Sequence, residues 1–426
     1  MISHFDVVVA GAGPGGIAAA TIASEVGLRV CLVDDNPALG GQIWRGHDPD
    51  ADGAKIRNRA AQNWMQRLRA SGCSIWPGMR IVCEPRKNIL RLEGQSAVRD
   101  VAFGRLIVAT GARERFLPFP GWTLPGVVGA GAAQALLKSG FEVSGRRAVV
   151  SGSGPLLLAV GAGLRSKGAQ VLGIYEQATS AQLARFAPTL FRHPRKLLEG
   201  AQYRMQLGFA PYRTGCWVLK AEGGDNLQRV TITNGRKQWT IKCDLLACGF
   251  HLVPNLELPV LLGCRVVDGY VSVDDLQQSS RAEVSCIGEL TGVGGVEKAL
   301  LEGEIAGLHA AGAKAKTAPL QRRLRKQLQF TRGLDRAFQL RTELRSLPTA
   351  DTLVCRCEDV SYQALCRQDA WKAAKLQTRA GMGACQGRVC GSAAEFLFGW
   401  QKQDMRPPVF PATVSTMAAD LREVDV

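Results

Sequence analysis

The stretch FDVVVAGAGPGG (residues 5–16) decides the fold of this chain. Residues 5–10 form a short apolar run, typical of a strand that is buried on both faces. In the glycine pattern that follows, Gly11 permits a tight turn, and Gly13 lets the backbone approach a pyrophosphate. Gly16 lets the next helix pack closely on the strand. This order of strand, glycines and helix predicts a Rossmann-type dinucleotide-binding unit.

The residues that follow extend this prediction. The alanine-rich run IAAATIASEV is a helix candidate that ends at Gly27, and LRVCLVDD is a second buried strand that ends in Asp34. The helix N-terminus offers free N–H groups and a positive dipole end to phosphates. Asp34 lies 18 residues past Gly16 and can accept hydrogen bonds from a ribose. These features predict a bound dinucleotide without separating FAD from NAD.

Two later segments favour FAD. LIVATGAR (106–113) and VSCIGELTGVGG (284–295) resemble the second and third flavin-contacting elements of flavoproteins with two dinucleotide domains. In that family, an acidic residue after the third element holds the flavin ribityl chain, and the matching residue here is Glu289. The candidate cofactor-binding residues are Gly11, Gly13, Pro14, Gly16, Asp34, Asp35, Gly41, Gln42, Val82, Thr110, Gly111, Gly288 and Glu289.

Residues 146–177 repeat the pattern of strand, glycine loop, helix and strand, ending at Glu176. The third glycine position is occupied by Leu157, whose side chain would hold helix and strand apart. We therefore leave three alternatives open for this second unit: NAD, a non-redox adenine nucleotide, or a scaffold without a nucleotide. Glu176 disfavours a 2′-phosphate, so NAD is expected over NADP.

Neither unit carries the Cys-x-x-Cys pair that disulfide reductases use. Cys243 and Cys248 are five residues apart in an expected strand and should lie on opposite faces as core cysteines. A dithiol–disulfide relay is therefore not expected.

Four cysteines near the C-terminus form two close pairs, in CRC and ACQGRVC. Soft thiolates favour zinc or iron–sulfur, and four cysteines are what a [2Fe–2S] cluster requires. Glycines around the second pair let backbone N–H groups approach the sulfurs. Spacing alone leaves zinc open, but a flavin in the same chain favours the cluster. The expected ligands are Cys355, Cys357, Cys385 and Cys390, and Cys366 is expected to be a packing residue.

The composition limits the classes of protein to which the chain can belong. The 426 residues predict two or three domains, and 53 basic against 37 acidic residues give a net charge of +16. The 13 cysteines, the lack of a secretory start and the lack of a long apolar run predict a cytoplasmic protein without a membrane span.

Four segments together resemble one family over essentially the whole chain. They are AGAGPGG…DDNPALGGQIWR, ATGARERFLPFPGWTLPGV, GELTGVGGVEKALLEG and CRCEDV…TRAGMGACQGRVCG. The chain resembles the FAD-containing alpha (A) subunit of heteromeric bacterial amine dehydrogenases, which include D-hydroxyproline dehydrogenase, the octopine and nopaline (opine) dehydrogenases or oxidases, and hydrogen cyanide synthase. The C-terminal segment resembles bacterioferritin-associated ferredoxin, with a wider second cysteine pair.

This resemblance implies an α/β fold with two Rossmann-type dinucleotide-binding domains, like that of the disulfide reductases, and a small [2Fe–2S] domain. It implies a partner beta subunit that resembles D-amino-acid oxidases and oxidises the substrate at its own flavin. It also allows a small ferredoxin-like gamma subunit. The expected domains are an FAD-binding region 1–115, an inserted NAD(P)-binding-like domain 116–252, an FAD-binding return 253–313, a basic connector 314–350 and a cluster domain 351–426.

The connector carries leucine and phenylalanine at roughly helical spacing, interrupted at Gly333. The first interpretation of this connector is a solvated basic face, and the second is a docking surface for an acidic subunit. Nucleic-acid binding comes last, because no aromatic stacking platform or reader motif accompanies the charge. We do not expect a nucleic-acid partner.

Three functions follow from these features. The first is an electron-transferring subunit of a dye-linked dehydrogenase for a secondary amine or imino acid, of the D-hydroxyproline or opine type. The alternative is a self-sufficient NAD(P)H-dependent flavin reductase that feeds a redox partner. The third is a scaffold whose FAD and metal are structural. The five histidines are scattered, so no catalytic residue is nominated.

Overall fold

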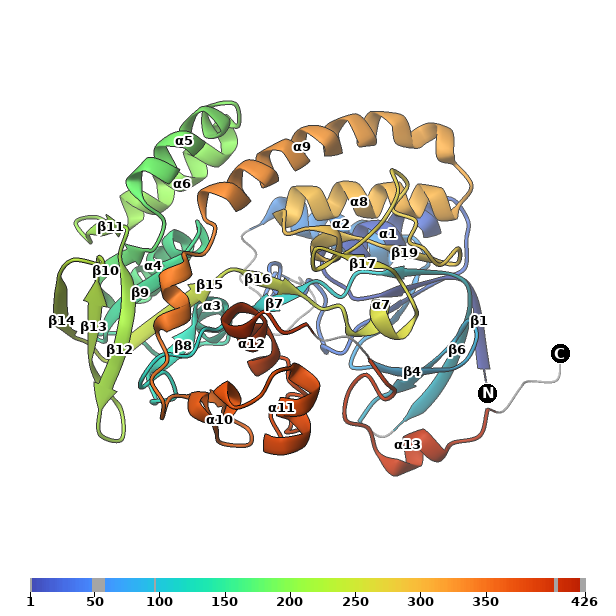
Figure 1. Ribbon diagram of the computed structural model, residues 1–426. Coiled ribbons are helices and arrows are strands. Elements are labelled where there is room, and N and C mark those ends of the chain that lie inside the picture. Colours follow the sequence, from blue (N-terminus) through green and yellow to red (C-terminus); the bar gives the residue numbers. More distant parts are fainter. Residues whose placement is uncertain (1, 48–57, 96, 402–404, 422–426) are drawn as a thin grey trace. The chain divides into compact units, whose positions relative to one another are not determined.

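The computed structural model describes residues 2–47, 58–95, 97–401 and 405–421, which fall into two compact units (Figure 1). The first unit comprises Met1–Arg113, Pro254–Thr331 and Asp404–Val426, and the second comprises Glu114–Val253 and Arg332–Gln403. The second unit is therefore inserted into the first along the chain.

The boundaries expected at residues 115 and 252 lie within two residues of the first two chain crossings. The crossings carry strands β7 (Ala112–Glu114) and β16 (Leu252–Pro254). The expected connector 314–350 is divided between the units after residue 331. The segment 405–421, expected in the cluster domain, belongs to the first unit.

The sheet of the first unit joins a parallel half to an antiparallel half. Its strands are β1 (Ile2–Ala10), β2 (Val30–Val33), β3 (Ser74–Trp76), β4 (Arg80–Arg86), β5 (Ile89–Glu93), β6 (Val98–Val108) and β19 (Val284–Cys286). The order is β3-β2-β1-β6-β5-β4, with β19 also paired to β6. Strands β1, β2, β3, β6 and β19 are parallel, whereas β4, β5 and β6 form an antiparallel meander. The parallel strands are short apolar runs because both of their faces are covered.

Helices and short elements complete the first unit. They are α1 (Pro14–Glu25), α2 (Arg59–Ala70), α7 (Glu257–Leu261), β17 (Val266–Val267), β18 (Tyr270–Val271), the 3₁₀ turns η1 (Gly288–Thr291) and η2 (Lys314–Thr317), α8 (Gly295–Ala310) and α13 (Val414–Ala418). Figure 1 shows α1, α2 and α8 gathered above the parallel strands.

Helices α1 and α8 pack closely because both carry small residues at the contact. A Cβ on Gly303 would overlap the carbonyl oxygen of Gly15, and a Cβ on Gly307 would lie 2.8 Å from the carbonyl oxygen of Ala19. Backbones can approach this closely only where no side chain intervenes. The glycines of α8 therefore set the distance between the two helices.

The second unit contains a parallel sheet of order β11-β10-β9-β15-β8 and an antiparallel sheet of order β12-β13-β14. Its strands are β8 (Val127–Gly129), β9 (Arg147–Ser153), β10 (Gln170–Glu176), β11 (Tyr212–Thr214), β12 (Trp217–Gly223), β13 (Leu227–Thr233), β14 (Gln238–Lys242) and β15 (Leu245–Phe250). Its helices in this region are α3 (Ala130–Lys138), α4 (Leu156–Ser166), α5 (Ser180–Phe191) and α6 (Pro194–Gln206).

Cys243 and Cys248 are both buried and unpaired in disulfides, but they do not lie on opposite faces of one strand. Cys243 precedes the start of β15, so the two-residue alternation of a strand does not reach it. Both side chains belong to one core, which lies between the two sheets of the second unit.

The basic connector contains one continuous helix, α9 (Ala318–Ala337), which runs through Gly333 without a break. The expected interruption is wrong, because Gly333 serves close packing. A Cβ there would lie 3.1 Å from a Thr189 methyl group and 3.3 Å from the Phe186 ring on α5. A glycine in a helix costs about 1 kcal/mol relative to alanine, which tertiary packing can offset. No described helix combines the length and apolarity needed to cross a membrane.

The cysteine-rich region belongs to the second unit and has a small core of its own. Its elements are η3 (Thr342–Ser346), β20 (Leu353–Cys355), β21 (Val360–Ser361), α10 (Tyr362–Cys366), α11 (Trp371–Thr378) and α12 (Cys390–Phe398). The Trp122 indole N–H donates to the carbonyl of Leu353 at 2.6 Å, which attaches the region to the rest of the unit.

We predict that Gly303→Ala destabilises the protein by about 1–3 kcal/mol, because the new methyl group must displace the backbone of α1. Gly200→Ala in α6 is the matched control, since a Cβ there meets nothing within 4 Å. It should stabilise the protein by about 0.5–1 kcal/mol. Urea unfolding of both variants measures the difference. Equal changes in free energy would contradict the close helix contact.

Candidate functional site

The first glycine loop is a tight connection between β1 and α1. The Gly11 N–H donates to the Val33 carbonyl at 2.7 Å, and the Ala12 N–H donates to the Asp34 carboxylate at 2.5 Å. A Cβ on Gly16 would overlap the carbonyl oxygen of Gly11, so only glycine allows this helix to start so close to the strand.

Open space lies over Gly13, the residue that precedes α1. A Cβ on Gly13 would meet nothing within 4 Å, and Pro14 takes the first helical position. No side chain caps this helix end and no acid lies in its first turn, so its positive dipole is not neutralised by the helix itself. A Cβ on Gly41 would lie 3.0 Å from the Gly13 Cα, which brings the loop that carries Gln42 over the same end. These features make a cradle that fits a phosphate group.

The two acidic residues after β2, Asp34 and Asp35, differ in solvent exposure. The Asp34 carboxylate is 9% exposed and also accepts from the backbone and side-chain nitrogens of Asn36, at 2.7 and 2.8 Å. With three donors already bound, it has room for about one more. Asp35 is exposed and its carboxylate contacts the Asn36 amide at 3.0 Å. Both acids therefore lie at the edge of the cradle, where a ribose hydroxyl could be recognised.

Thr110 and Gly111 are held by a residue that the sequence did not single out. The Asn255 side chain donates to the Thr110 carbonyl at 2.7 Å, and its backbone N–H donates to the Gly111 carbonyl at 2.9 Å. Arg113 donates to the side-chain oxygen of Asn255 at 2.7 Å and also pairs with Glu257. No sequence pattern marks Asn255, because its partners lie about 145 residues away.

Gly288 and Glu289 lie in the turn η1 between β19 and α8. The Glu289 carboxylate accepts the backbone N–H groups of Gly294 and Gly295, both at 2.9 Å. Burial raises the pKa of Glu289, while these N–H groups oppose the shift. The turn is therefore anchored to the first residues of α8 by the side chain that is expected to face a ribityl chain.

A fully buried ion pair in α8 also holds the turn η1 in place. Lys298 and Glu302, one helical turn apart in α8, pair at 2.8 Å. The Lys298 ammonium also donates to the Gly288 carbonyl at 2.6 Å and to the Thr291 hydroxyl at 2.7 Å. The Gly288 N–H donates to Glu302 at 2.7 Å. Sequence reasoning missed this pair, although a Lys–Glu spacing of four inside an otherwise apolar helix was an available signal.

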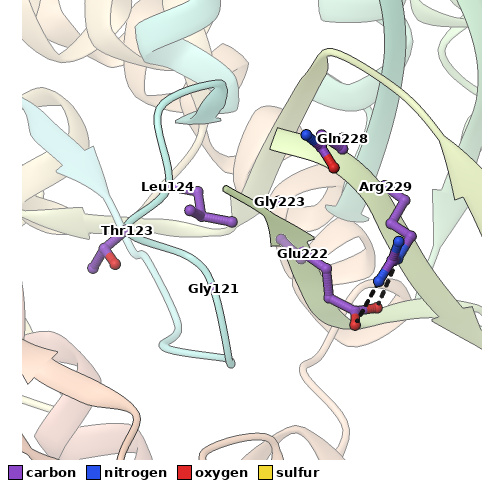
Figure 2. A pocket seen from close by; sticks show the side chains of 8 residues that line it. Gly121, Thr123, Leu124, Glu222, Gly223, Gln228 and Arg229 are labelled. Atoms are coloured by element: carbon purple, nitrogen blue, oxygen red, sulfur yellow. Dashed lines mark hydrogen bonds and ion pairs between the residues drawn. The ribbon is translucent and has the colours of Figure 1, made fainter. Parts of the chain in front are cut away.

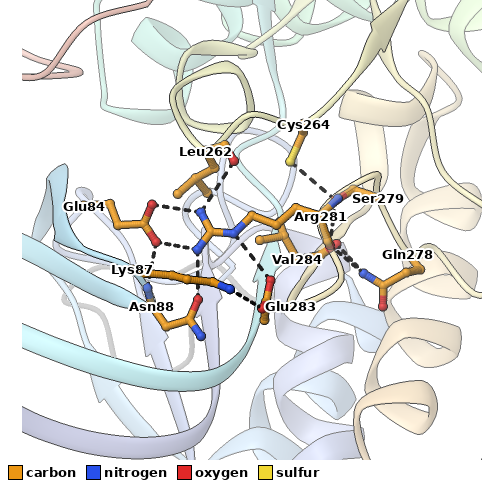
Figure 3. Close-up of polar contacts among 10 residues, drawn as sticks. All are labelled: Glu84, Lys87, Asn88, Leu262, Cys264, Gln278, Ser279, Arg281, Glu283 and Val284. Atoms are coloured by element: carbon orange, nitrogen blue, oxygen red, sulfur yellow. Dashed lines mark hydrogen bonds and ion pairs between the residues drawn. The ribbon is translucent and has the colours of Figure 1, made fainter.

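Arg281 ties the segment before β19 to the β4–β5 turn (Figure 3). Its guanidinium donates to Glu84 at 2.6 and 2.8 Å and to the Asn88 side chain at 2.8 Å. The Glu84 hydrogen bonds raise the pKa of Arg281, and Glu283 adds a further negative charge. These charge-assisted hydrogen bonds hold the segment that leads into β19, the strand that precedes Gly288 and Glu289.

Val82 is fully buried on β4, and its carbonyl accepts the backbone N–H of Val409 at 2.7 Å. The C-terminal segment makes further contacts with the same meander. Arg91, in a buried pair with Asp100, donates to the carbonyl of Thr416 at 3.1 Å. The structure thus places Val82 beneath the segment 405–421, with its carbonyl already bonded.

The second glycine loop differs from the first in its opening turn. The N–H groups of Leu157 and Leu158 bond back three residues, to Gly154 and Pro155, at 3.1 and 3.2 Å. In α1, by contrast, Ile17 bonds back four residues to Gly13. An N–H group that could face a phosphate is thereby used within the loop, and the buried Leu157 side chain lies in the core of the second unit.

Glu176 is also used by its own loop. It is fully buried, and its carboxylate accepts from the N–H groups of Gly154 at 2.8 Å and Ala178 at 2.9 Å. Burial raises its pKa to about 7. With two donors bound its lone pairs are not all used, but its complete burial makes it less accessible to a ribose than Asp34.

An open pocket of about 570 Å³ lies elsewhere on the second unit, between the loop 121–124 and the strands β12 and β13 (Figure 2). The exposed pair of Glu222 and Arg229 forms one side of its wall. None of the predicted cofactor-binding residues or cysteines lines it, so it carries no chemistry that we can assign. The lining residues are Gly121, Thr123, Leu124, Ala221, Glu222, Gly223, Gln228 and Arg229.

The four expected cysteine ligands come together in the second unit. Their sulfurs are in hydrogen-bond contact in the order Cys355, Cys390, Cys385 and Cys357. Within the described residues, no group of three or more His, Cys, Asp or Glu side chains surrounds a position ready for a metal ion. The four thiols are free, and each contacts the next through a hydrogen bond, not a disulfide. Cys366 does not belong to this chain of thiols, but it is exposed on α10, so the expectation that it is a packing residue is wrong.

Backbone N–H groups point at the sulfurs. Those of Glu358 and Gly381 contact Cys355, and those of Gly387 and Val389 contact Cys385. A Cβ on Gly383 would overlap the Cβ of Cys357, so this glycine lets the two cysteine segments meet. Four neighbouring sulfurs with backbone N–H groups close by have the chemistry of cluster ligands, although in the described residues they do not enclose a metal position.

Comparison with known proteins extends this geometry. The family model described as pyridine nucleotide-disulphide oxidoreductase matches residues 5–315. The HcnB subunit of hydrogen cyanide synthase from Pseudomonas protegens is 32% identical, over 90% of this chain and 89% of the relative. The A subunit of opine oxidase from Rhizobium meliloti is 29% identical, over 98% and 99%. The solved structure of L-proline dehydrogenase from P. horikoshii shares the fold, with a TM-score of 0.69 and 18% identity, over 98% of this chain and 81% of that chain.

We predict that Lys298→Met costs about 3–5 kcal/mol of stability, because it leaves the Glu302 carboxylate buried without its cation. Burial raises the pKa of Glu302, and the positive charge of Lys298 lowers it. Removing Lys298 therefore raises the pKa of Glu302 further. The penalty should therefore shrink as the pH falls from about 8 to about 5.

Urea unfolding at both pH values measures this effect. Adding Glu302→Gln should recover most of the loss. Lys196→Met breaks the half-exposed pair with Glu199 and should cost less than about 0.5 kcal/mol. A Lys298→Met penalty as small as this control would contradict the buried pair.

A second prediction concerns Glu176, whose pKa of about 7 lies above its ordinary 4.5. A raised pKa gives stability that is complete below about pH 4.5 and is lost as the pH rises through about 7. Since a glutamine at this position does not titrate, Glu176→Gln should gain stability relative to the parent between pH 5 and 8, by about 3 kcal/mol at most. The control is Glu222→Gln at a residue whose pKa is lowered by Arg229, which should show no trend over this range. Parallel curves for the parent and Glu176→Gln would refute the raised pKa.

Proposed function

This chain belongs to the pyridine nucleotide-disulphide oxidoreductase family, and on that premise we propose that it is the electron-transferring FAD/[2Fe–2S] alpha subunit of a heteromeric dye-linked dehydrogenase. The chain is an oxidoreductase. In the proposed complex, a beta subunit that resembles D-amino-acid oxidases oxidises a secondary amine or imino acid, of the D-hydroxyproline or opine type. This chain accepts the electrons and passes them on.

The observation that carries the proposal is the contrast between the two glycine loops. The first has the open helix end over Gly13 and the close approach of Gly16 to Gly11. The second has the buried Leu157 at the position of Gly16, and its first turn closes over three residues instead of four. The start of α1 therefore keeps one more free N–H group for a pyrophosphate than the start of α4, which favours the first loop as the dinucleotide site.

Features of the first unit support FAD as the dinucleotide. The glycine loop would hold the pyrophosphate, Asp34 and Asp35 lie where a ribose would be recognised, and the turn with Glu289 would face the ribityl chain. Lys298 and Glu302 fix that turn from the buried side. Bound FAD would accept two electrons at a time and a [2Fe–2S] cluster would release them singly.

The cysteine chain supports the cluster. Cys355 and Cys390 are buried, whereas Cys357 is exposed and Cys385 is half-buried. A cluster held here would be sheltered on one side and open on the other. Electrons could leave the cluster on the exposed side, at Cys357, when a partner protein binds there.

The names of the relatives support a multi-subunit enzyme, because two of them are themselves described as subunits, of hydrogen cyanide synthase and of opine oxidase. A small ferredoxin-like gamma subunit is a further component that we propose for such a complex. The alternative function, a self-sufficient NAD(P)H-dependent flavin reductase, requires a working second unit. In the proposed complex the second unit holds either a non-redox adenine nucleotide or none, since its loop is arranged differently from the first.

One preparation tests the proposal. The purified chain should show a flavin spectrum together with about two iron and two acid-labile sulfide per chain. Cys357→Ser should lose the iron and sulfide while it keeps the flavin, because the two sites use different residues. The matched control is Cys366→Ser, an exposed cysteine outside the thiol chain, which should keep both. Zinc in place of iron would refute the cluster.

Anaerobic titration of the same preparation with NADH separates the two functions. The flavin absorbance should not change at stoichiometric NADH, because in the proposed complex the second unit does not bind NADH as a hydride donor. Prompt bleaching of the flavin would overturn the alpha-subunit proposal in favour of the reductase. Oxidation of D-hydroxyproline or an opine at full rate by the isolated chain would overturn it as well.

A further inference from the structure

A group of large apolar side chains is exposed on the hairpin of α5 and α6, which lie side by side in Figure 1. Phe191 is 70% exposed, Leu198 62%, Met205 80% and Phe209 fully exposed. We call these four residues the hairpin patch. Single exposed apolar residues are ordinary, but four large ones on one helical hairpin make this motif a candidate for contact with another molecule.

The patch is not explained by the stability of the second unit. Leu198 and Met205 are seven residues apart and share one stripe of α6. No residue of α6 is fully buried, and the contact with the core of the unit is made by Tyr203 and by Leu207, which follows the helix. The outward apolar stripe therefore adds nothing to the core and exposes apolar surface to water.

The positive charge of the hairpin limits which kind of partner surface can bind the hairpin patch. Residues 180–209 contain five basic side chains and one acid, Glu199, within a chain of net charge +16. A twofold contact between two copies would place the same basic residues opposite one another, which is repulsive. An acidic surface would instead be attracted. The basic residues are Arg185, Arg192, Arg195, Lys196 and Arg204.

We propose that the hairpin patch docks the substrate-oxidising flavoprotein subunit of the complex, through a surface that is apolar at its centre and acidic at its rim. This inference rests on the proposed function, which requires such a subunit. Phe191 and Phe209 would be the anchors, because aromatic side chains are enriched at the buried centres of protein interfaces. The surrounding arginines would orient the partner and speed its association.

The test uses the complex purified from its own cells through a tag on this chain. Met205→Glu with Phe209→Ser should weaken retention of the second flavoprotein at least tenfold, because a charge and a polar group replace two apolar contacts. Both positions are exposed, so the flavin content and thermal unfolding of the variant chain should equal those of the parent. Val414→Ser, which removes an 84% exposed apolar residue from the first unit, is the matched control and should retain the partner.

A second variant checks the charge argument. Arg192→Glu with Arg195→Glu should also release the partner, and retention by the parent should weaken as salt rises. Sedimentation and subunit ratios on stained gels measure both effects.

The outcomes are distinguishable. A variant that keeps its partner at the parent ratio overturns the docking proposal alone. So does a patch variant that loses only binding to phosphatidylcholine–phosphatidylglycerol vesicles, or only co-purifying nucleic acid, since the patch would then serve a membrane or a nucleic acid. A parent chain that purifies without any second flavoprotein overturns the proposed function, and the docking proposal with it.

Discussion

The close approach of α1 to β1, at the carbonyl oxygen of Gly11, is the constraint on which the first unit depends. It places the helix end beside the glycine loop and directs the other side of α1 towards α8. There Gly15 and Gly303 repeat the same kind of contact between backbones. Because α8 begins directly after the turn that carries Glu289, the position of that turn is set by helix contacts made of glycine and alanine. The buried ion pair beneath the turn then fixes it locally.

The second unit shows what happens when this constraint is relaxed. The strand, loop, helix and strand are all present, so the fold does not require the third glycine. With Leu157 in its place, the first turn of the helix tightens, and the Leu157 N–H bonds back to the Gly154 carbonyl. The same sequence pattern therefore supports two helix starts, one whose first hydrogen bond spans four residues and one whose first bonds span three.

The features that could be predicted from the sequence depend on neighbours along the chain. The two Rossmann-type units follow from apolar runs and glycine spacing, and the pairing of CRC with ACQGRVC indicates that the thiols meet. The features that could not be predicted depend on distant partners. Asn255 holds Thr110, Arg281 reaches Glu84, and a few polar contacts place the segment 405–421 in the first unit. The helix through Gly333 was missed because only the tertiary contact with α5 explains a glycine there.

Leu157 also bears on how such a protein can evolve. Its side chain is fully buried beside Gly249 and Val150, in the core of the second unit. A single change to glycine would open a cavity and weaken the helix, at a cost of about 3 kcal/mol or more. Glu176 would still be bonded to the loop after that change. A loop with the glycine pattern of the first unit is thus separated from the present one by less stable single substitutions, so it is reached only together with compensating changes in the core.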